Sequence, residues 1–404
     1  MIEKLLLTVL ILRTAWRIFL EVLNLLHSTG PKVQIPDVLK DRITPEVLEK
    51  SRSYLKDRTR LKIVSEIVQL FVTIYLVLYG LPWLEKLFLT HSPLLQAFLL
   101  FGALGLILYT VNLPFRLYSI FVIESKYGFN TTKKRTFLRD QILTISLIVA
   151  LSLLLIPLLL WLLSHHFWWW QASILAFGFI LFFWFIQPTL IAPLFYTFTE
   201  LEDEELKRKI RELIEKASAK ILKIYKVNAS KRTKKQNAYV TGIGRSRRLV
   251  LYDTLMDYPQ DELLAVVGHE LGHHAKKHIQ KDVILFSIYA TVLLYLTNFL
   301  YWQILKSNAF DVQRPHTIFV YSLLFVSAIG YFLEPVVNYI SRKMEYEADE
   351  FSAKLLNTPA FMISTLKRLV RANLSNPNPH PLYKVWYYNH PAPEERIKAL
   401  SQLR

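Results

Sequence analysis

Residues 142–192 read ILTISLIVALSLLLIPLLLWLLSHHFWWWQASILAFGFILFFWFIQPTLIA and contain no Asp, Glu, Lys or Arg. A bilayer core of about 30 Å is crossed by roughly 20 apolar residues in a helix, so this stretch is long enough for two spans joined at residues 164–167. The whole chain of 404 residues has the same character, with 52% hydrophobic residues, 14% aromatic residues and a mean hydropathy of +0.26. The sequence therefore predicts a membrane protein and argues against a string of soluble domains.

Working outward from this stretch, five further apolar runs are each long enough for one span. We therefore expect an all-α polytopic protein with seven transmembrane helices. Because the chain has no cysteine, disulfides, thiol catalysis and cysteine metal sites are excluded. The expected spans are residues 5–26, 63–84, 94–114, 142–163, 168–192, 283–305 and 317–338.

Lys and Arg are concentrated in alternate connections between these spans. In chain order, the segments hold 9, 1, 6, 0, 18, 2 and 10 of them. Positively charged connections stay in the cytosol, so the first, third and fifth connections and the C-terminal tail are expected there. The net charge of +17 then reflects topology, and no nucleic-acid partner is expected. The membrane would be that of the endoplasmic reticulum in a eukaryote and the cytoplasmic membrane in a prokaryote.

The first expected span carries three charged residues, Arg13, Arg17 and Glu21, each four residues from the next. This spacing places them on one face of a helix. Charges at such a depth usually face the interior of a bundle or a watery cavity, so we expect the same here. The alternative for Glu21 is that it lies near a helix end and reaches out to the interface.

The long polar insertion begins with a helical pattern at 201–224 and then changes to short apolar segments. The segments 224–228, 237–241 and 248–252 are rich in Tyr, Val, Leu and Ile, and Gly242 and Gly244 lie between the last two, which predicts a small β-hairpin. Another helix is expected from Asp261 towards Lys277. The chain thus divides into residues 1–192 with five spans, the cytosolic insertion 193–282, residues 283–338 with two spans, and the cytosolic tail 339–404.

The helix after the hairpin carries the motif HExxH, with His269, Glu270 and His273. Two histidines four residues apart point the same way and can occupy two corners of a zinc tetrahedron, while Glu270 lies beside them to act on a bound water. The alternative is a pair of solvated histidines on a basic helix face. His274 and His278 lie off the face of the pair, and we expect both to be solvated.

A catalytic zinc ion needs a third protein ligand and one open position. Downstream, a polar stripe at steps of three and four residues continues the seventh expected span. Within it we interpret Glu345 as the third ligand and Asp349 as an acceptor that orients a histidine ligand, although spacing alone leaves Glu345, Glu347 and Asp349 nearly equal. The stripe consists of Glu334, Asn338, Ser341, Glu345 and Asp349.

Several motifs, spread over nearly the whole chain, resemble those of the type I CAAX prenyl endopeptidases, which are integral membrane zinc metalloproteases. Together they are far more specific than HExxH alone. The motifs are Glu124–Asn130 (ESKYGFN), Pro188–Phe195 (PTLIAPLF), Ser230, Asn237–Tyr239, Leu251–Leu255 (LYDTL), Val267–His273 (VGHELGH), Ser341–Phe351 (SRKMEYEADEF) and Asn389–Arg396 (NHPAPEER).

The resemblance implies roles for several residues. It makes Glu345 the zinc ligand within EYEAD, assigns His390 to the oxyanion of the reaction and assigns Arg396 to support of the site or the substrate. It further implies a single catalytic zinc ion, a zincin-like protease region and a water-filled chamber enclosed by the helices. The substrate would be a peptide or protein ending in a prenylated CAAX motif.

Glu270 is expected to act as the general base in peptide-bond hydrolysis. Asn237 is a candidate for holding the substrate backbone, since an extended peptide can add to a strand edge; otherwise it is a turn residue. Two other functions compete. One is a quality-control zinc protease resembling the bacterial heat-shock metalloproteases, which have fewer spans. The other is a transporter or receptor with a structural zinc, in which Glu270 would be dispensable.

Overall fold

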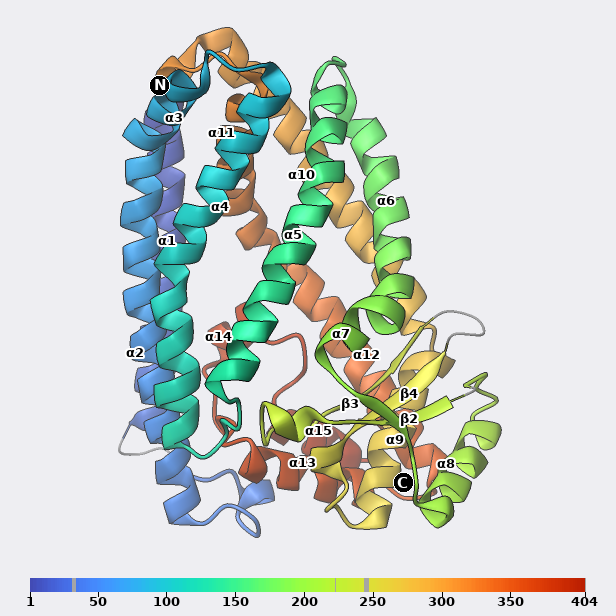
Figure 1. Ribbon diagram of the computed structural model, residues 1–404. Helices are drawn as coiled ribbons and strands as arrows, with labels where there is room; N and C mark the ends of the chain where they lie inside the picture. The colour runs from blue at the N-terminus through green and yellow to red at the C-terminus, as the bar shows by residue number, and fades with distance from the viewer. Residues whose placement is uncertain (31–33, 222, 243–246, 404) are drawn as a thin grey trace.

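The computed structural model describes residues 1–30, 34–221, 223–242 and 247–403, so Gly244 of the expected hairpin turn lies outside the described residues. Long helices form a tall bundle, and a small sheet with several shorter helices lies at one end of it (Figure 1). We call this the sheet end and the opposite one the far end. The N-terminus lies at the far end and the C-terminus at the sheet end.

Six helices among the described residues are long and apolar enough to cross a membrane, and each contains one of the six later runs expected from the sequence. Three of them include a π-helical segment (η2, η3 and η4). The six are α2 (Pro45–Tyr75) continued by η2 (Leu76–Gly80) and α3 (Leu81–Phe88); α4 (Pro93–Tyr118) with η3 (Ser119–Glu124); α5 (Lys134–Leu163); α6 (Trp168–Ile186) with η4 (Gln187–Ile191) and α7 (Ala192–Phe195); α10 (His278–Ser307); and α11 (Pro315–Gly330) with η9 (Tyr331–Leu333) and α12 (Glu334–Leu355).

The first apolar run forms α1 (Ile2–Thr29), which packs against α2 and α11 but is not among these six. The expected count of seven spans is therefore not confirmed. The charges of α1 face the bundle interior as expected: Arg17 Nη2 lies 2.7 Å from Glu66 Oε1, and Glu21 is 2% exposed and paired with Lys62. The alternative in which Glu21 reaches out to the interface is wrong, because its partner lies on α2.

The sheet has four strands in the order β1-β2-β4-β3. The expected hairpin is present as the antiparallel pair β3 and β4, but β4 also pairs in parallel with β2, and β2 pairs antiparallel with β1. The strand β3 is thus an edge strand. The strands are β1 (Phe198–Glu200), β2 (Lys223–Val227), β3 (Ala238–Thr241) and β4 (Arg248–Tyr252).

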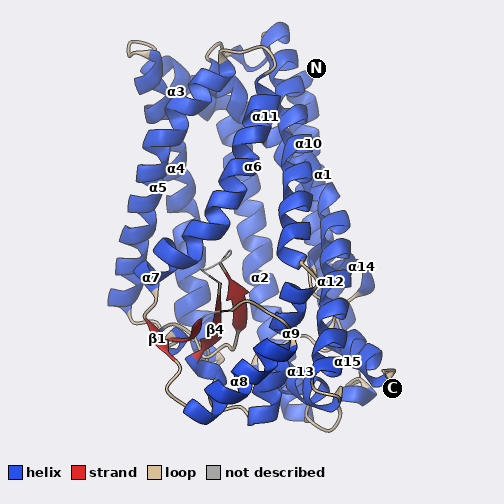
Figure 2. Ribbon diagram, turned by 90° about the vertical axis from the view of Figure 1, so that its right-hand side faces the viewer, coloured by secondary structure: helices blue, strands red, loops and turns tan. Residues whose placement is uncertain are grey.

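Shorter helices lie at this end with the sheet: α8 and α9 are close to the strands, and α13, α14 and α15 lie beyond α9 (Figure 2). The helix expected over 201–224 ends earlier, at Lys216, where Ser218 adopts a positive φ of 49°. The core of this end is formed where the apolar faces of α8 and α9 meet β4, with Leu249, Leu251 and Leu263 fully buried. The helices are α8 (Glu204–Lys216), α9 (Gln260–Ala275), α13 (Ala360–Ala372), α14 (Pro381–Tyr387) and α15 (Pro393–Ser401), and the 3₁₀ turns are η1 (Asp37–Leu39), η5 (Ala229–Lys231), η7 (Asp253–Leu255) and η8 (Ala309–Asp311).

The helices α9 and α12 cross at very short distance because two glycines of α9 face α12. A Cβ atom on Gly272 would lie 2.9 Å from Ala348 Cα, and one on Gly268 would lie 2.8 Å from Ser352 Oγ. Ser352 Oγ in turn donates a hydrogen bond of 2.8 Å to the carbonyl oxygen of Ala265. This close crossing brings the HExxH segment against the acidic stripe of α12.

Candidate metal centre

Three side chains from α9 and α12 converge on one point. The Nε2 atoms of His269 and His273 lie 3.1 Å apart, and the carboxylate of Glu345 lies 3.4 Å from the first and 3.3 Å from the second. Two ligand atoms at tetrahedral corners, each about 2.0–2.1 Å from a zinc ion, would be about 3.3 Å apart. The three residues are therefore placed as adjacent ligands of one ion, and their ligand atoms all lie within 4.8 Å of one another.

The charge and hydrogen bonding at this point also fit a divalent cation. Glu345 Oε2 is buried and has no hydrogen-bond partner, although a buried carboxylate oxygen normally has one. Burial acts to lower the pKa of His269, but the hydrogen bonds and charges of Asp349 and Glu345 outweigh it and raise this pKa to about 10. Two imidazole nitrogens and one carboxylate oxygen are a donor set of catalytic zinc.

The ring of His269 is held from behind by Asp349 and Arg396. His269 Nδ1 lies 2.8 Å from Asp349 Oδ1, as expected for an acceptor that orients a histidine. Arg396 on α15 donates to both oxygens of Asp349, from Nε at 2.7 Å and from Nη2 at 2.6 Å. Arg396 thus lies behind the ligands, and it also contacts two of them directly, with Nη1 3.5 Å from Glu345 Oε2 and Nη2 3.4 Å from His269 Nδ1.

The ring of His273 is held in a similar way by His278, at the start of α10. The two Nδ1 atoms lie 2.9 Å apart, and His278 Nε2 lies 3.0 Å from Glu347 Oε2, which also accepts a 3.1 Å hydrogen bond from Lys281. The expectation that His278 is solvated is wrong, since it is only 2% exposed. The chain turns between α9 and α10 at Lys277, with φ 57°, and this turn brings His278 back towards His273.

His274 is half-buried, and its Nε2 lies 3.4 Å from Arg247 Nη1. Burial lowers its pKa, and the charge of Arg247 acts in the same direction. Among the described residues, its side-chain hydrogen bond goes to Arg247 and not to a metal ligand.

Glu270 lies between the histidines and the sheet. Its Oε2 accepts a hydrogen bond of 3.3 Å from the backbone N–H of Val240 on β3, and burial raises its pKa. A carboxylate with a raised pKa can hold a proton more readily, which suits a group that takes a proton and then gives it up.

His390 approaches the same point from the segment between α14 and α15. Its Nε2 lies 3.3 Å from Glu345 Oε1, its Nδ1 lies 2.8 Å from Asn389 Oδ1, and its side chain is 56% exposed. Burial by the surrounding protein lowers its pKa. The ring is thus oriented by Asn389 and still accessible to a substrate.

Asn237 stands apart from the metal ligands, directly before β3. Its side chain is exposed, and its carbonyl oxygen accepts a hydrogen bond of 3.1 Å from the N–H of Tyr252. The structure therefore brings seven of the eight expected site residues together and leaves Asn237 beside them on the edge strand.

A bundle of apolar helices with a buried HExxH centre defines the chain as an integral membrane zinc metalloprotease. Residues 25–197 match the CAAX prenyl protease N-terminal family of five membrane helices, and residues 200–404 match peptidase family M48. The chain belongs to this family of CAAX prenyl proteases. It is a zinc metalloendopeptidase of the membrane.

Individual relatives agree with this assignment over almost the full length. The chain is 31% identical to CAAX prenyl protease 1 homolog of Arabidopsis thaliana, over 95% of this chain and 94% of that one. It is also 31% identical to CAAX prenyl protease 1 of Saccharomyces cerevisiae, over 92% and 89%. The crystal structure of S. mikatae Ste24p superimposes with a TM-score of 0.92 at 28% identity, covering 98% of both chains.

Proposed function

We propose that this protease cleaves peptides and proteins near a C-terminal CAAX motif whose cysteine carries a prenyl chain. The observation that carries the proposal is the placement of Glu270 between the paired histidines and the free edge of β3. The relatives are named for CAAX prenyl proteolysis, and their similarity extends over both halves of the chain.

His269, His273 and Glu345 hold the zinc ion in this proposal. When bound, zinc polarises the scissile carbonyl and lowers the pKa of a water molecule. Glu270 accepts the proton of that water and delivers it to the leaving amine. Asp349 and His278 keep the two imidazole rings in orientation, and Arg396 acts by fixing Asp349.

The substrate backbone adds to the free edge of β3. In an antiparallel pair, successive residues turn their N–H and C=O groups alternately towards and away from the partner strand. The carbonyl of Asn237 bonds to β4, so the backbone groups of Ala238 and Val240 point to the free edge. The N–H of Val240 donates to Glu270, which supports this direction; a peptide strand added here would then lie beside Glu270.

His390 donates a hydrogen bond to the oxyanion that forms at the scissile carbonyl. Nδ1 faces Asn389 Oδ1 and donates to it, so donation through Nε2 as well requires that the ring carries a proton on both nitrogens. Asn237 then has only its side chain available for the substrate, because its carbonyl is already engaged with β4.

We further propose that α1 is a seventh span and that the sheet end faces the cytosol. The pairing of Arg17 with Glu66 and of Glu21 with Lys62 removes the charges of α1 from the lipid. Single cysteines at positions 165 and 230 should then react from opposite sides of the membrane. If both react from the same side, the topology is wrong.

The substrate proposal is tested with matched peptides that end in a CAAX motif, one prenylated and one bare. Burial of a prenyl chain contributes roughly 0.8 kcal/mol per CH₂, while backbone capture along β3 is shared by both peptides. We expect cleavage of both, with a lower kcat/KM for the bare peptide. A bare peptide left intact at high enzyme concentration would show that the lipid is obligatory for recognition.

A further inference from the structure

A polar pocket of about 580 Å³ lies between α1, α2 and α14. None of the metal ligands lines it. Three cationic side chains line it, namely Arg58, Lys62 and Lys235. Hydroxyl groups line the same space, among them those of Tyr383 and Tyr388. Such a lining suits a small anion more than an apolar group.

Two of the three cationic side chains form ion pairs with carboxylates, and within the described residues the third, Arg58, does not. Lys62 pairs with Glu21, and Lys235 Nζ lies 3.0 Å from Glu124 Oε2. The guanidinium of Arg58 lies 5.4 Å from the centre of the Tyr54 ring, and no ion pair is formed by Arg58 within the part of the chain that the structure describes. Its side chain is exposed and hydrogen-bonds the hydroxyl of Tyr54, which leaves the other donors of its fork for an incoming anion.

The pocket adjoins two segments of the proposed site, the one that leads into β3 and the one between α14 and α15. Lys235 stands two residues before Asn237, at the start of the edge strand β3, and Tyr388 stands two residues before His390. Antiparallel addition is the more stable form of strand pairing, so the C-terminal direction of a bound peptide runs from Val240 past Asn237 towards Lys235.

The distance along this path matches a short C-terminal segment. In a CAAX motif three residues follow the cysteine, and three extended residues span about 10 Å at roughly 3.3 Å each. With the scissile carbonyl beside Glu270, opposite Val240, the end of such a segment lies level with the start of β3. An arginine side chain from α2 can then meet it.

We propose that this pocket binds the free α-carboxylate of the substrate, with Arg58 as its main contact. The inference rests on the proposed function, because it takes the C-terminal tripeptide as the part that occupies the β3 edge. A guanidinium binds a carboxylate through two parallel hydrogen bonds, which gives both strength and direction. The pocket thereby sets the distance from the C-terminus at which the chain is cut.

The test compares a prenylated CAAX peptide with a free C-terminal carboxylate and the same peptide ending in an amide. Hydrogen bonds to charged groups are strong enough that the wild type should prefer the free acid by roughly 10- to 100-fold in kcat/KM. Arg58→Ala should lose this preference by cutting the acid more slowly, with the amide unchanged. Arg58→Lys should keep part of it, because the charge remains.

Arg60→Ala is the matched control, since Arg60 is on the same helix and lines a different pocket, beside Asp57 and Lys126. It should leave both peptides unchanged, and zinc content should be equal in all variants. Equal cleavage of acid and amide by the wild type, or an equal loss of both in Arg58→Ala, overturns the carboxylate site while the proposed function stands. A wild type that cleaves neither peptide, but cleaves other peptides with zinc, overturns the proposed function and this inference with it.

Discussion

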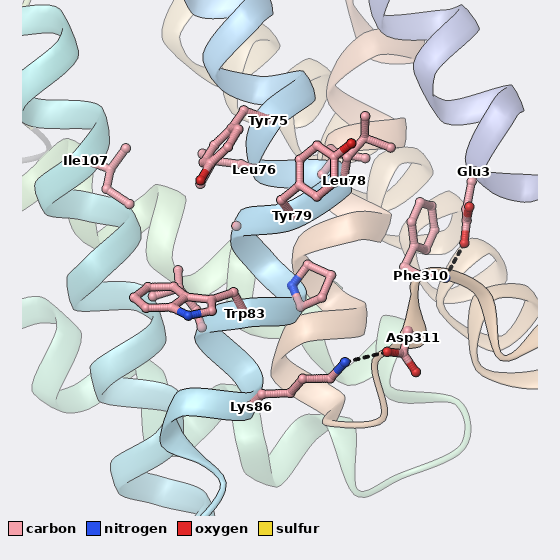
Figure 3. A pocket seen from close by; sticks show the side chains of 14 residues that line it. Glu3, Tyr75, Leu76, Leu78, Tyr79, Trp83, Lys86, Ile107, Phe310 and Asp311 are labelled. Carbon is pink, nitrogen blue, oxygen red and sulfur yellow. Dashed lines mark hydrogen bonds and ion pairs between the residues drawn. The ribbon is translucent and has the colours of Figure 1, made fainter.

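Buried carboxylates occur at both ends of the bundle, and they are used differently. At the far end, the buried Glu85 accepts hydrogen bonds from the backbone N–H groups of Gln313, at 2.8 Å, and Arg314, while the exposed Glu3 accepts one of 2.7 Å from the N–H of Phe310. Figure 3 shows Glu3 and Phe310 there, beside an apolar pocket of about 720 Å³ and the ion pair of Lys86 with Asp311. At the sheet end, Glu345 faces two imidazole rings and keeps one buried oxygen without a hydrogen-bond partner.

A structural carboxylate and a metal ligand therefore differ in their partners: the first is bonded by backbone N–H groups, and the second faces other ligand side chains. Backbone amides bond both far-end carboxylates, so these residues hold the 308–314 connection in place. Among the described residues, the carboxylate at the sheet end has only ion-pair contacts, with Arg396, His390 and the two ligand histidines, and an ion between it and these two histidines would supply the missing bond to its buried oxygen. Substitutions at the two ends should therefore affect different properties, zinc binding and turnover at one end and folding stability at the other.

The largest effect is expected for Glu345→Ala. Two histidines alone leave a weak and poorly shaped zinc site, so zinc occupancy should fall sharply and turnover with it. Zinc content of the purified protein, measured by elemental analysis, checks this. Full zinc content in the variant would move the ligand role to Glu347 or Asp349.

His390→Ala should affect turnover but not the metal. Removing one oxyanion donor usually costs about 10²- to 10³-fold in kcat, and His390 contacts the site from the open side. We expect unchanged zinc content and nearly unchanged KM for a prenylated peptide. An unchanged kcat would leave His390 as an ordinary exposed side chain.

His278→Ala should weaken zinc binding without abolishing it. Loss of the group that orients a ligating histidine typically reduces metal affinity by roughly 10- to 100-fold. Competition with a chelator measures the affinity directly. His274→Ala is the control, because His274 directly follows His273 but its side chain bonds Arg247 and not the His273 ring. Equal affinities in the two variants would contradict the orienting role of His278.

Glu85→Ala at the far end is expected to have no effect on the metal centre and only a small effect on stability. The backbone N–H groups of Gln313 and Arg314 would lose their acceptor, which costs about 1–3 kcal/mol of folding free energy. The melting temperature should fall while zinc content and kcat stay the same. Loss of zinc in this variant would show that the two ends are coupled.

The spans and the centre of the site could be predicted because each depends on short-range pattern. Apolar runs as long as 142–163 must lie in lipid or in a core, and six of the seven runs are helices long and apolar enough to span. The HExxH residues were identified because a spacing of four puts two histidines on one helix face. The choice of Glu345 over Glu347 needed the family resemblance, since spacing alone did not separate them.

The remaining features depend on contacts between distant segments. The close crossing at Gly272 is decided by Ala348, on another helix, and nothing in the local sequence around Gly272 indicates it. Helical spacing alone predicts a solvated His278, because the local sequence does not indicate the left-handed turn at Lys277 that brings it back to His273. The parallel pairing of β2 with β4 joins two strands that have β3 between them in the sequence. A local sequence pattern can therefore predict the β3–β4 hairpin but not this pairing.

The central claim, that Glu270 performs acid–base chemistry next to a zinc ion held by other residues, is tested most directly by Glu270→Gln. We predict wild-type zinc content together with a loss of turnover of roughly 10²- to 10⁴-fold on a prenylated CAAX peptide, because the amide can still accept the Val240 hydrogen bond but cannot take a proton. Zinc content and kcat are measured on the same preparation. Wild-type turnover with full zinc content would contradict the account and make the zinc site structural.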